Sequence, residues 1–158
     1  MKKQHFAREQ FLSLVDTMPL VSVDFIVEQH GKILLGKRNN RPAQGCWFVP
    51  GGRIFKGEKI VDAMVRILDK ELSLGTLLTE AKVTPEFQGV YQHFYGDCFA
   101  GDIGVSTHYI VLGHRLHLDG DINLQSHDDQ HGELAWWSVD ELLGTTEVHQ
   151  YTKDYFLK

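Results

Sequence analysis

Hydrophobic and polar residues alternate over residues 20–28, the pattern that predicts a half-buried β-strand. One face of this segment carries valine and phenylalanine. The opposite face carries the remaining residues Ser22, Asp24 and Ile26. The dipeptide His30-Gly31 predicts a turn into a second strand. We therefore expect a strand pair near the start of the chain, with Asp24 on the polar face of its strand.

The rest of the chain predicts a mixed order of elements. Further strands are expected at residues 32–37, 47–49, 87–95, 107–118 and 134–137. Helices are expected at residues 6–16 and 58–72, after Ser138, and at about 147–156. Ser138 and Glu141 have the spacing of a capping box, which marks a helix start. This order indicates an α+β fold or an α/β/α sandwich rather than a repeated βαβ fold.

The predicted helix over residues 58–72 carries a carboxylate inside its apolar face. At about 100° per residue, Glu71 falls between Ile60 and Met64. A buried carboxylate without a counter-ion would cost several kcal/mol or take up a proton. A metal ion or an arginine would remove that cost. The alternative is that Glu71, near the helix end, turns its side chain to water.

The amino-acid composition limits which kinds of function this chain can have. The chain has 158 residues, 42% of them hydrophobic and 23% charged, as expected for one globular domain over residues 1–158. Its net charge of −5 argues against a nucleic-acid partner, so an anionic substrate would need clustered arginines or a metal. Two cysteines are too few for a disulfide framework. No long apolar run predicts a membrane span or a signal peptide, and we expect a cytoplasmic protein.

The loop and helix around Glu71 resemble the Nudix box, G-x5-E-x7-R-E-U-x-E-E-x-G-U, where U is a bulky apolar residue. The positions that match in register are Gly52, Glu58, Arg66, Leu68, Glu71 and Leu74. Ile67, Lys70 and Ser73 depart from the box, and the first two replace glutamates. Typical Nudix enzymes use that carboxylate cluster to hold several Mg²⁺ ions. The loss of two carboxylates favours a single ion here.

The same departures resemble the GDP-mannose mannosyl hydrolases, a branch of the Nudix superfamily. The stretches Arg41-Pro42-Ala43-Gln44-Gly45 and Trp47-Phe48-Val49-Pro50-Gly51-Gly52-Arg53 are similar to that branch, as is most of the chain. The resemblance implies a Nudix-type α/β/α sandwich with a mixed β-sheet, and a homodimer. It also implies hydrolysis of a nucleotide sugar, GDP-mannose or GDP-glucose, to GDP and free hexose. Water would attack sugar C1 with inversion.

The resemblance also implies roles for single residues. One Mg²⁺ per subunit, with Mn²⁺ as the alternative ion, would be held by Glu71, the carbonyl of Gly51 and Gln130. Arg38, Arg53 and Tyr109 would neutralise the leaving GDP, and His131 would be the general base. Asp24 and His93 would contact the substrate or leaving group. Arg66 would either contact the substrate or hold Glu71 in place.

Two other functions remain open on the sequence. A Nudix pyrophosphohydrolase would keep the fold and the metal but attack phosphorus. A non-catalytic module would use the altered box only to bind a nucleotide. The latter has little need of a base, so the combination of Glu71, Gln130 and His131 favours an enzyme.

Overall fold

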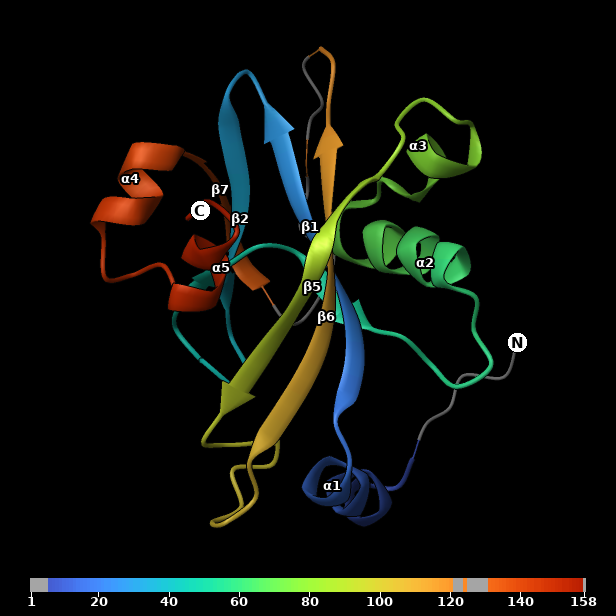
Figure 1. Cartoon of the computed structure of the whole chain (residues 1–158), viewed down its shortest axis with the longest axis vertical. Coiled ribbons are helices and arrows are strands. Elements are labelled where there is room, and N and C mark those ends of the chain that lie inside the picture. The colour runs from blue at the N-terminus through green and yellow to red at the C-terminus, as the bar shows by residue number, and fades with distance from the viewer. Residues whose placement is uncertain (1–5, 121–123, 125–130, 158) are drawn as a thin grey trace.

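The computed structural model describes residues 6–120, 124 and 131–157, with only the backbone of His131. Its strands form one mixed sheet in the order β3-β2-β1-β6-β5, to which β4 is added beside β1 and β7 beside β2 (Figure 1). The strands are β1 (Leu20–Gln29), β2 (Lys32–Arg38), β3 (Trp47–Phe48), β4 (Gly51–Arg53), β5 (Glu86–Tyr95), β6 (Thr107–His117) and β7 (His131–Ser138). The helices are α1 (Arg8–Thr17), α2 (Ile60–Leu72), α3 (Gly75–Thr79), α4 (Val139–Gly144) and α5 (Gln150–Asp154).

Strand β1 lies at the centre of this arrangement. It pairs in parallel with β6, from Leu20 opposite Tyr109 to Glu28 opposite His117. Its pairings with β2 and β4 are antiparallel. Because β1 has neighbours along both edges, it is a central strand, and its side chains alternate between the two faces of the sheet.

Helices cover both faces of the sheet, with α2 and α3 on one side and α4 and α5 on the other (Figure 1). Val23, Phe25 and Val27 pack in one core cluster with α2, while Ile26 packs in a second cluster with Leu142 of α4. The predicted division of β1 into two faces holds for Val23, Phe25 and Val27 against Ile26, but the prediction of a half-buried strand is wrong, because both faces are largely covered. The α+β sandwich with a mixed sheet is also confirmed.

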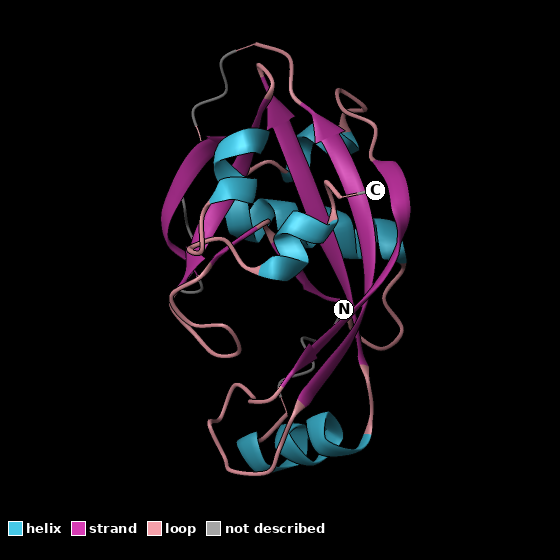
Figure 2. Cartoon of the chain, turned by 60° about the vertical axis from the view of Figure 1, so that its left-hand side comes forward, coloured by secondary structure: helices cyan, strands magenta, loops and turns pink. Residues whose placement is uncertain are grey.

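Helix α1 lies apart from the body of the sandwich, beside the turn that joins β5 to β6 (Figure 2). Val15 of this helix packs with Leu20 and Cys98 in a small third cluster. An exposed ion pair of 3.0 Å joins Arg8 to Asp102 across the same contact. None of the helices within the described part of the chain is long and apolar enough to span a membrane.

Several predicted boundaries differ from the structure. Helix α2 begins at Ile60 rather than Glu58, because the Glu58 side chain bonds to the backbone of the preceding loop. The short elements β4 and α3 were not predicted, and the last helix spans only Gln150–Asp154. The capping box is confirmed, since Glu141 N donates to Ser138 Oγ at 3.2 Å and Ser138 N donates to Glu141 Oε2 at 2.9 Å.

Candidate active site

The structure brings the predicted site residues to one cavity of about 370 Å³. Eight of the ten line it: Asp24, Arg38, Gly51, Arg53, Arg66, Glu71, His93 and Tyr109. Gln130 lies outside the described residues. The backbone of His131 pairs with Arg38 at the start of β7, which places this predicted base on the strand next to β2.

The cavity is basic although the chain is acidic. Among the described residues that line it, five are basic and two are acidic: Arg38, Arg41, Arg53, Arg66 and Lys70 against Asp24 and Glu71. The whole chain has a net charge of −5. The clustering therefore suits an anionic ligand such as a diphosphate, as we expected if the substrate is anionic.

Glu71 is buried on the cavity side of α2. Only 3% of its surface is exposed, so the alternative that it turns to water is wrong. One turn earlier on α2, Ile67 is 2% exposed and packs against Gly52, where an added Cβ would lie 3.1 Å from Ile67 Cγ1. The position of the missing box glutamate is thus filled by apolar packing, and Glu71 lies beside that contact.

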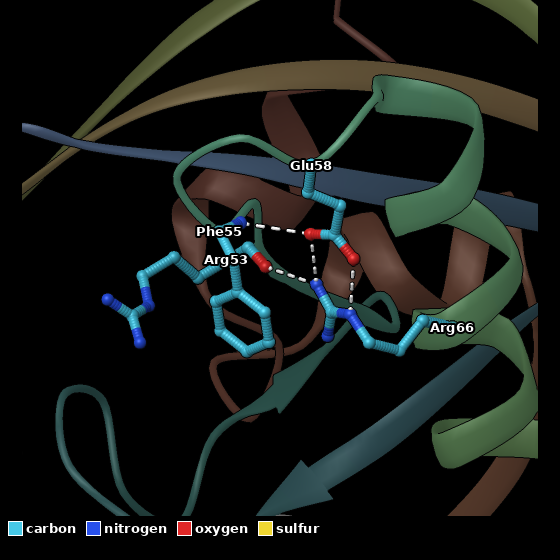
Figure 3. A network of polar contacts seen from close by, with 4 residues as sticks. All are labelled: Arg53, Phe55, Glu58 and Arg66. Carbon is cyan, nitrogen blue, oxygen red and sulfur yellow. Dashed lines mark hydrogen bonds and ion pairs between the residues drawn. The ribbon is translucent and has the colours of Figure 1, made fainter. Parts of the chain in front are cut away.

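Arg66 connects α2 to the loop that precedes it (Figure 3). It donates to Glu58 through Nε at 2.7 Å and Nη2 at 2.8 Å, and Nη2 also lies 2.8 Å from the Arg53 carbonyl. Its guanidinium stacks 4.0 Å from the Phe55 ring centroid. Neither predicted role includes these contacts, which fix the loop that runs from Arg53 at the end of β4 to Glu58.

Arg53 extends between two aromatic rings. Its guanidinium carbon lies 4.4 Å from the centroid of Phe11 on α1 and 5.0 Å from that of Phe55. Burial lowers the pKa of Arg53, and the Arg66 charge lowers it further while Tyr109 opposes both. A partly desolvated guanidinium binds an anion more strongly than an exposed one, since less water competes. Arg38 is held differently, with Nε donating to the Pro42 carbonyl at 2.9 Å.

Two aromatic groups that line the cavity are neutral at ordinary pH. Burial lowers the pKa of His93 to about 4, and the neighbouring His149 acts in the same direction. The His93 ring stacks on Tyr151 at 4.2 Å with an interplanar angle of 8°. Burial raises the pKa of Tyr109, so its phenol remains a hydrogen-bond donor. At neutral pH both groups can contact substrate through hydrogen bonds rather than through charge.

The oxygen ligands available here fit one Mg²⁺ ion. The Glu71 carboxylate is buried and lines the cavity together with Gly51, and carboxylate and carbonyl oxygens are the ligands that Mg²⁺ prefers. A cation would also offset the cost of burying this carboxylate. Across residues 6–120, 124 and 131–157, His131 side chain aside, no group of three or more His, Cys, Asp or Glu side chains is arranged to hold a metal. Glu71 and Gly51 thus remain two expected ligands that line the same cavity.

Comparison with known proteins identifies the class. The NUDIX domain model matches residues 18–157, and the chain belongs to the Nudix family. It is 39% identical over 126 residues to Low-salt glycan biosynthesis protein Agl8 of Haloferax volcanii, covering 80% of this chain and 75% of that protein. Over 56 residues it is 46% identical to an ADP-ribose pyrophosphatase of Methanocaldococcus jannaschii, covering 35% of this chain and 33% of that protein.

A solved structure agrees with the fold. The MutT NUDIX hydrolase from Burkholderia pseudomallei superposes with a TM-score of 0.66 at 24% identity, over 87% of this chain and 95% of that one. The family match and the cavity on the α2 side together define a Nudix hydrolase. Enzymes of this class act on nucleotide derivatives and generally use a divalent metal such as Mg²⁺.

Sequence reasoning missed several residues that shape the site, among them three aromatic ones. Phe11 and Phe55 line the cavity around Arg53. Tyr155 donates a hydrogen bond to Asp24 Oδ2 at 2.7 Å. Phe55 follows the predicted Gly51-Gly52-Arg53 loop closely and could have been found from that motif. Phe11 and Tyr155 are distant in sequence from the residues they contact, and no local pattern indicates such contacts.

Proposed function

We propose that this Nudix hydrolase cleaves a GDP-hexose, GDP-mannose first among them and GDP-glucose second, to GDP and the free sugar. The observation that carries the proposal is the composition of the α2 face at the cavity. There Ile67 packs against Gly52, Lys70 adds a positive charge, and Glu71 supplies the carboxylate. A site of this kind neutralises a diphosphate better than it assembles several metal ions at phosphorus.

Attack at sugar C1 places definite demands on the site. The departing diphosphate gains negative charge as the C1–O bond breaks, and Arg38, Arg53 and Tyr109 line the cavity where they can stabilise it. Bound Mg²⁺, held by Glu71, the Gly51 carbonyl and Gln130, would supply further positive charge at this diphosphate. Asp24 and His93 would contact the sugar or the leaving group.

The proton of the attacking water goes to His131 in this proposal. Inversion requires the base and the leaving group to lie on opposite sides of C1, as in other inverting glycoside hydrolysis. His131 begins β7, and its backbone is in register with that of Arg38 on β2. His131→Gln should reduce turnover at least a hundredfold at neutral pH and leave Mg²⁺ binding within about twofold. Unchanged turnover would remove His131 as the base.

Labelled water tests the position of attack. The purified protein is incubated with GDP-mannose and Mg²⁺ in ¹⁸O-water, and mass spectrometry shows which product contains ¹⁸O. Label in free mannose with unlabelled GDP supports attack at C1. Label in GMP or mannose 1-phosphate would show attack at phosphorus instead.

That second outcome is the alternative function, a Nudix pyrophosphohydrolase. The partial similarity to an ADP-ribose pyrophosphatase is the observation in its favour. A third function, a module that binds a nucleotide without turnover, predicts GDP binding with no product from any nucleotide sugar.

The proposal extends to the oligomeric state and the cellular location of the protein. We expect one domain over residues 1–158, a homodimer, and a cytoplasmic protein with no nucleic-acid or membrane partner. Light scattering on the purified protein measures the oligomeric state directly.

A further inference from the structure

Asp24 is flanked by glycines on both neighbouring strands. Its register partner on β4 is Gly51, and its partner on β6 is Gly113. A Cβ at Gly51 would lie 2.3 Å from Asp24 Oδ1, so the carboxylate occupies the space that a side chain would need. A Cβ at Gly113 would lie 2.9 Å from Tyr91 Cε2 and 3.4 Å from Tyr155 Cε1. The two glycines therefore make room for one carboxylate and for the rings beside it.

Tyr155 uses the space next to Gly113 to reach Asp24. Its hydroxyl donates to Asp24 Oδ2 at 2.7 Å, and its ring meets Tyr91 edge-on with centroids 4.6 Å apart. Asp24 lines the cavity, whereas Tyr155 is not among the described residues that line it. Tyr155 thus bonds to a carboxylate that lines the cavity without lining the cavity itself.

Helix α5 fixes the position of Tyr155, which follows directly after it. Tyr151 anchors this helix to β5, because its hydroxyl both accepts from Phe94 N and donates to the Phe94 carbonyl, each at 2.8 Å. The Tyr151 ring also stacks on His93. Burial and the charge of Asp24 raise the pKa of Tyr155, so its hydroxyl keeps the proton that it donates.

We infer that Tyr155 is a positioning residue, which holds the carboxylate of Asp24 in the orientation that faces the cavity. Tyr155 is not among the described residues that line the cavity, so in this inference it acts through Asp24. Its effect on turnover rests on the proposed function, whereas its pairing with Asp24 does not. The experiment therefore has a kinetic part and a part that needs no substrate.

The kinetic part compares Tyr155→Phe, Asp24→Ala and the double variant on GDP-mannose with Mg²⁺. Loss of the hydroxyl should lower kcat about tenfold and change KM less than twofold, since the carboxylate loses its orientation while the cavity keeps its lining. In the Asp24→Ala background the same change should have less than a twofold effect. Tyr91→Phe is the matched control, because it removes a hydroxyl from the same ring cluster, and it should leave kcat unchanged.

Equal kcat values for Tyr155→Phe and Tyr91→Phe would overturn the inference. So would a full tenfold loss in the Asp24→Ala background, because Tyr155 would then act independently of Asp24.

The second part measures urea unfolding of the same variants. Tyr155→Phe should raise the unfolding equilibrium constant about tenfold when Asp24 is present and clearly less when it is absent. If Asp24→Ala does not fold, Asp24→Asn replaces it, because an amide oxygen accepts a weaker hydrogen bond than a carboxylate. Equal effects in both backgrounds would overturn the pairing. Absent turnover by the unaltered chain would instead contradict the proposed function, and the unfolding data would still decide the role of Tyr155.

Discussion

Arg66 binds both carboxylate oxygens of Glu58, eight positions earlier in the chain, at 2.7 and 2.8 Å. The Glu58 side chain is 1% exposed, and its Oε2 also accepts from Phe55 N at 2.9 Å. This pair closes the loop between β4 and α2 and thereby sets the position of Arg53 at the cavity. The Glu58 and Arg66 positions of the Nudix box thus help to shape the cavity, although neither is among the proposed metal ligands.

Glu58→Gln should destabilise the protein by about 1–3 kcal/mol, because it weakens charge-assisted bonds to a nearly buried side chain. Urea unfolding measures the change. Disruption of the exposed pair between Arg8 and Asp102 by Arg8→Gln is the control and should cost less than about 1 kcal/mol. Equal effects in the two variants would contradict this account of the loop.

The same pair predicts a dependence of stability on acid. The hydrogen bond from Arg66 is the main cause that lowers the pKa of Glu58 below 4.5. A depressed folded-state pKa stabilises the protein above the unfolded pKa, and this contribution is lost as pH falls through the folded value. The stability difference between the unaltered protein and Glu58→Gln should therefore shrink below about pH 4.5. A difference that stays constant down to pH 3 would contradict the prediction.

His93 should titrate far below an ordinary histidine. Its pKa is about 4 in the folded protein against 6.5 ordinarily, so the unfolded chain binds more protons between these values. Stability contributed by the neutral ring is complete above pH 6.5 and is lost as pH falls toward 4. NMR of the ring carbons measures the pKa, with His93→Gln to assign the signal. A midpoint near 6.5 would contradict the burial described here.

Gly51→Ala should destabilise the protein by about 1–3 kcal/mol and reduce turnover, since the added methyl group would meet Asp24 Oδ1 and the Val23 carbonyl. Thermal unfolding and activity are measured together. Gly144→Ala at the end of α4 is the matched control, because an added Cβ there meets nothing within 4 Å. The control should be neutral or slightly stabilising.

Glu71→Gln should weaken Mg²⁺ binding at least tenfold, because the buried carboxylate is the charged ligand of the proposed site. Calorimetric titration with Mg²⁺ or Mn²⁺ gives the affinity. Asp69→Asn removes a carboxylate from the exposed face of the same helix and should leave the affinity within about twofold. An unchanged titration for Glu71→Gln would place the ion elsewhere.

Ser73→Gly should stabilise the protein by about 0.5–1 kcal/mol, since Ser73 ends α2 in the left-handed conformation with φ 57°. Ser13→Gly, at an exposed position within α1, should destabilise the protein by a similar amount. A stabilising Ser73→Gly together with a destabilising Ser13→Gly would show that α2 ends in the left-handed conformation that the glycine of the Nudix box suits. Two losses of stability would contradict this.

The sequence predicted those features that depend on neighbouring residues. Alternation gave β1, and helical periodicity placed Glu71 on the apolar face of α2, where it is indeed buried. It could not predict that Glu58 lies outside the helix, because its side chain is held there by both a loop amide and Arg66. Nor could it predict Tyr155 beside Asp24, since that contact depends on glycines of two other strands. The roles of Gln130 and of the His131 side chain stay predictions.

The parallel pairing of β1 with β6 has a consequence for how the protein reaches this state. Leu20 is paired with Tyr109 and Glu28 with His117, so these two strands can pair only after the long chain segment between them has closed into a loop. Closing a long loop costs conformational entropy before the strand–strand contacts can form, and this slows folding. Because Asp24 and Tyr109 face the cavity from these two strands, the binding site cannot precede the ladder. We therefore expect the cavity to form late in folding, after the local contacts between α2 and α3.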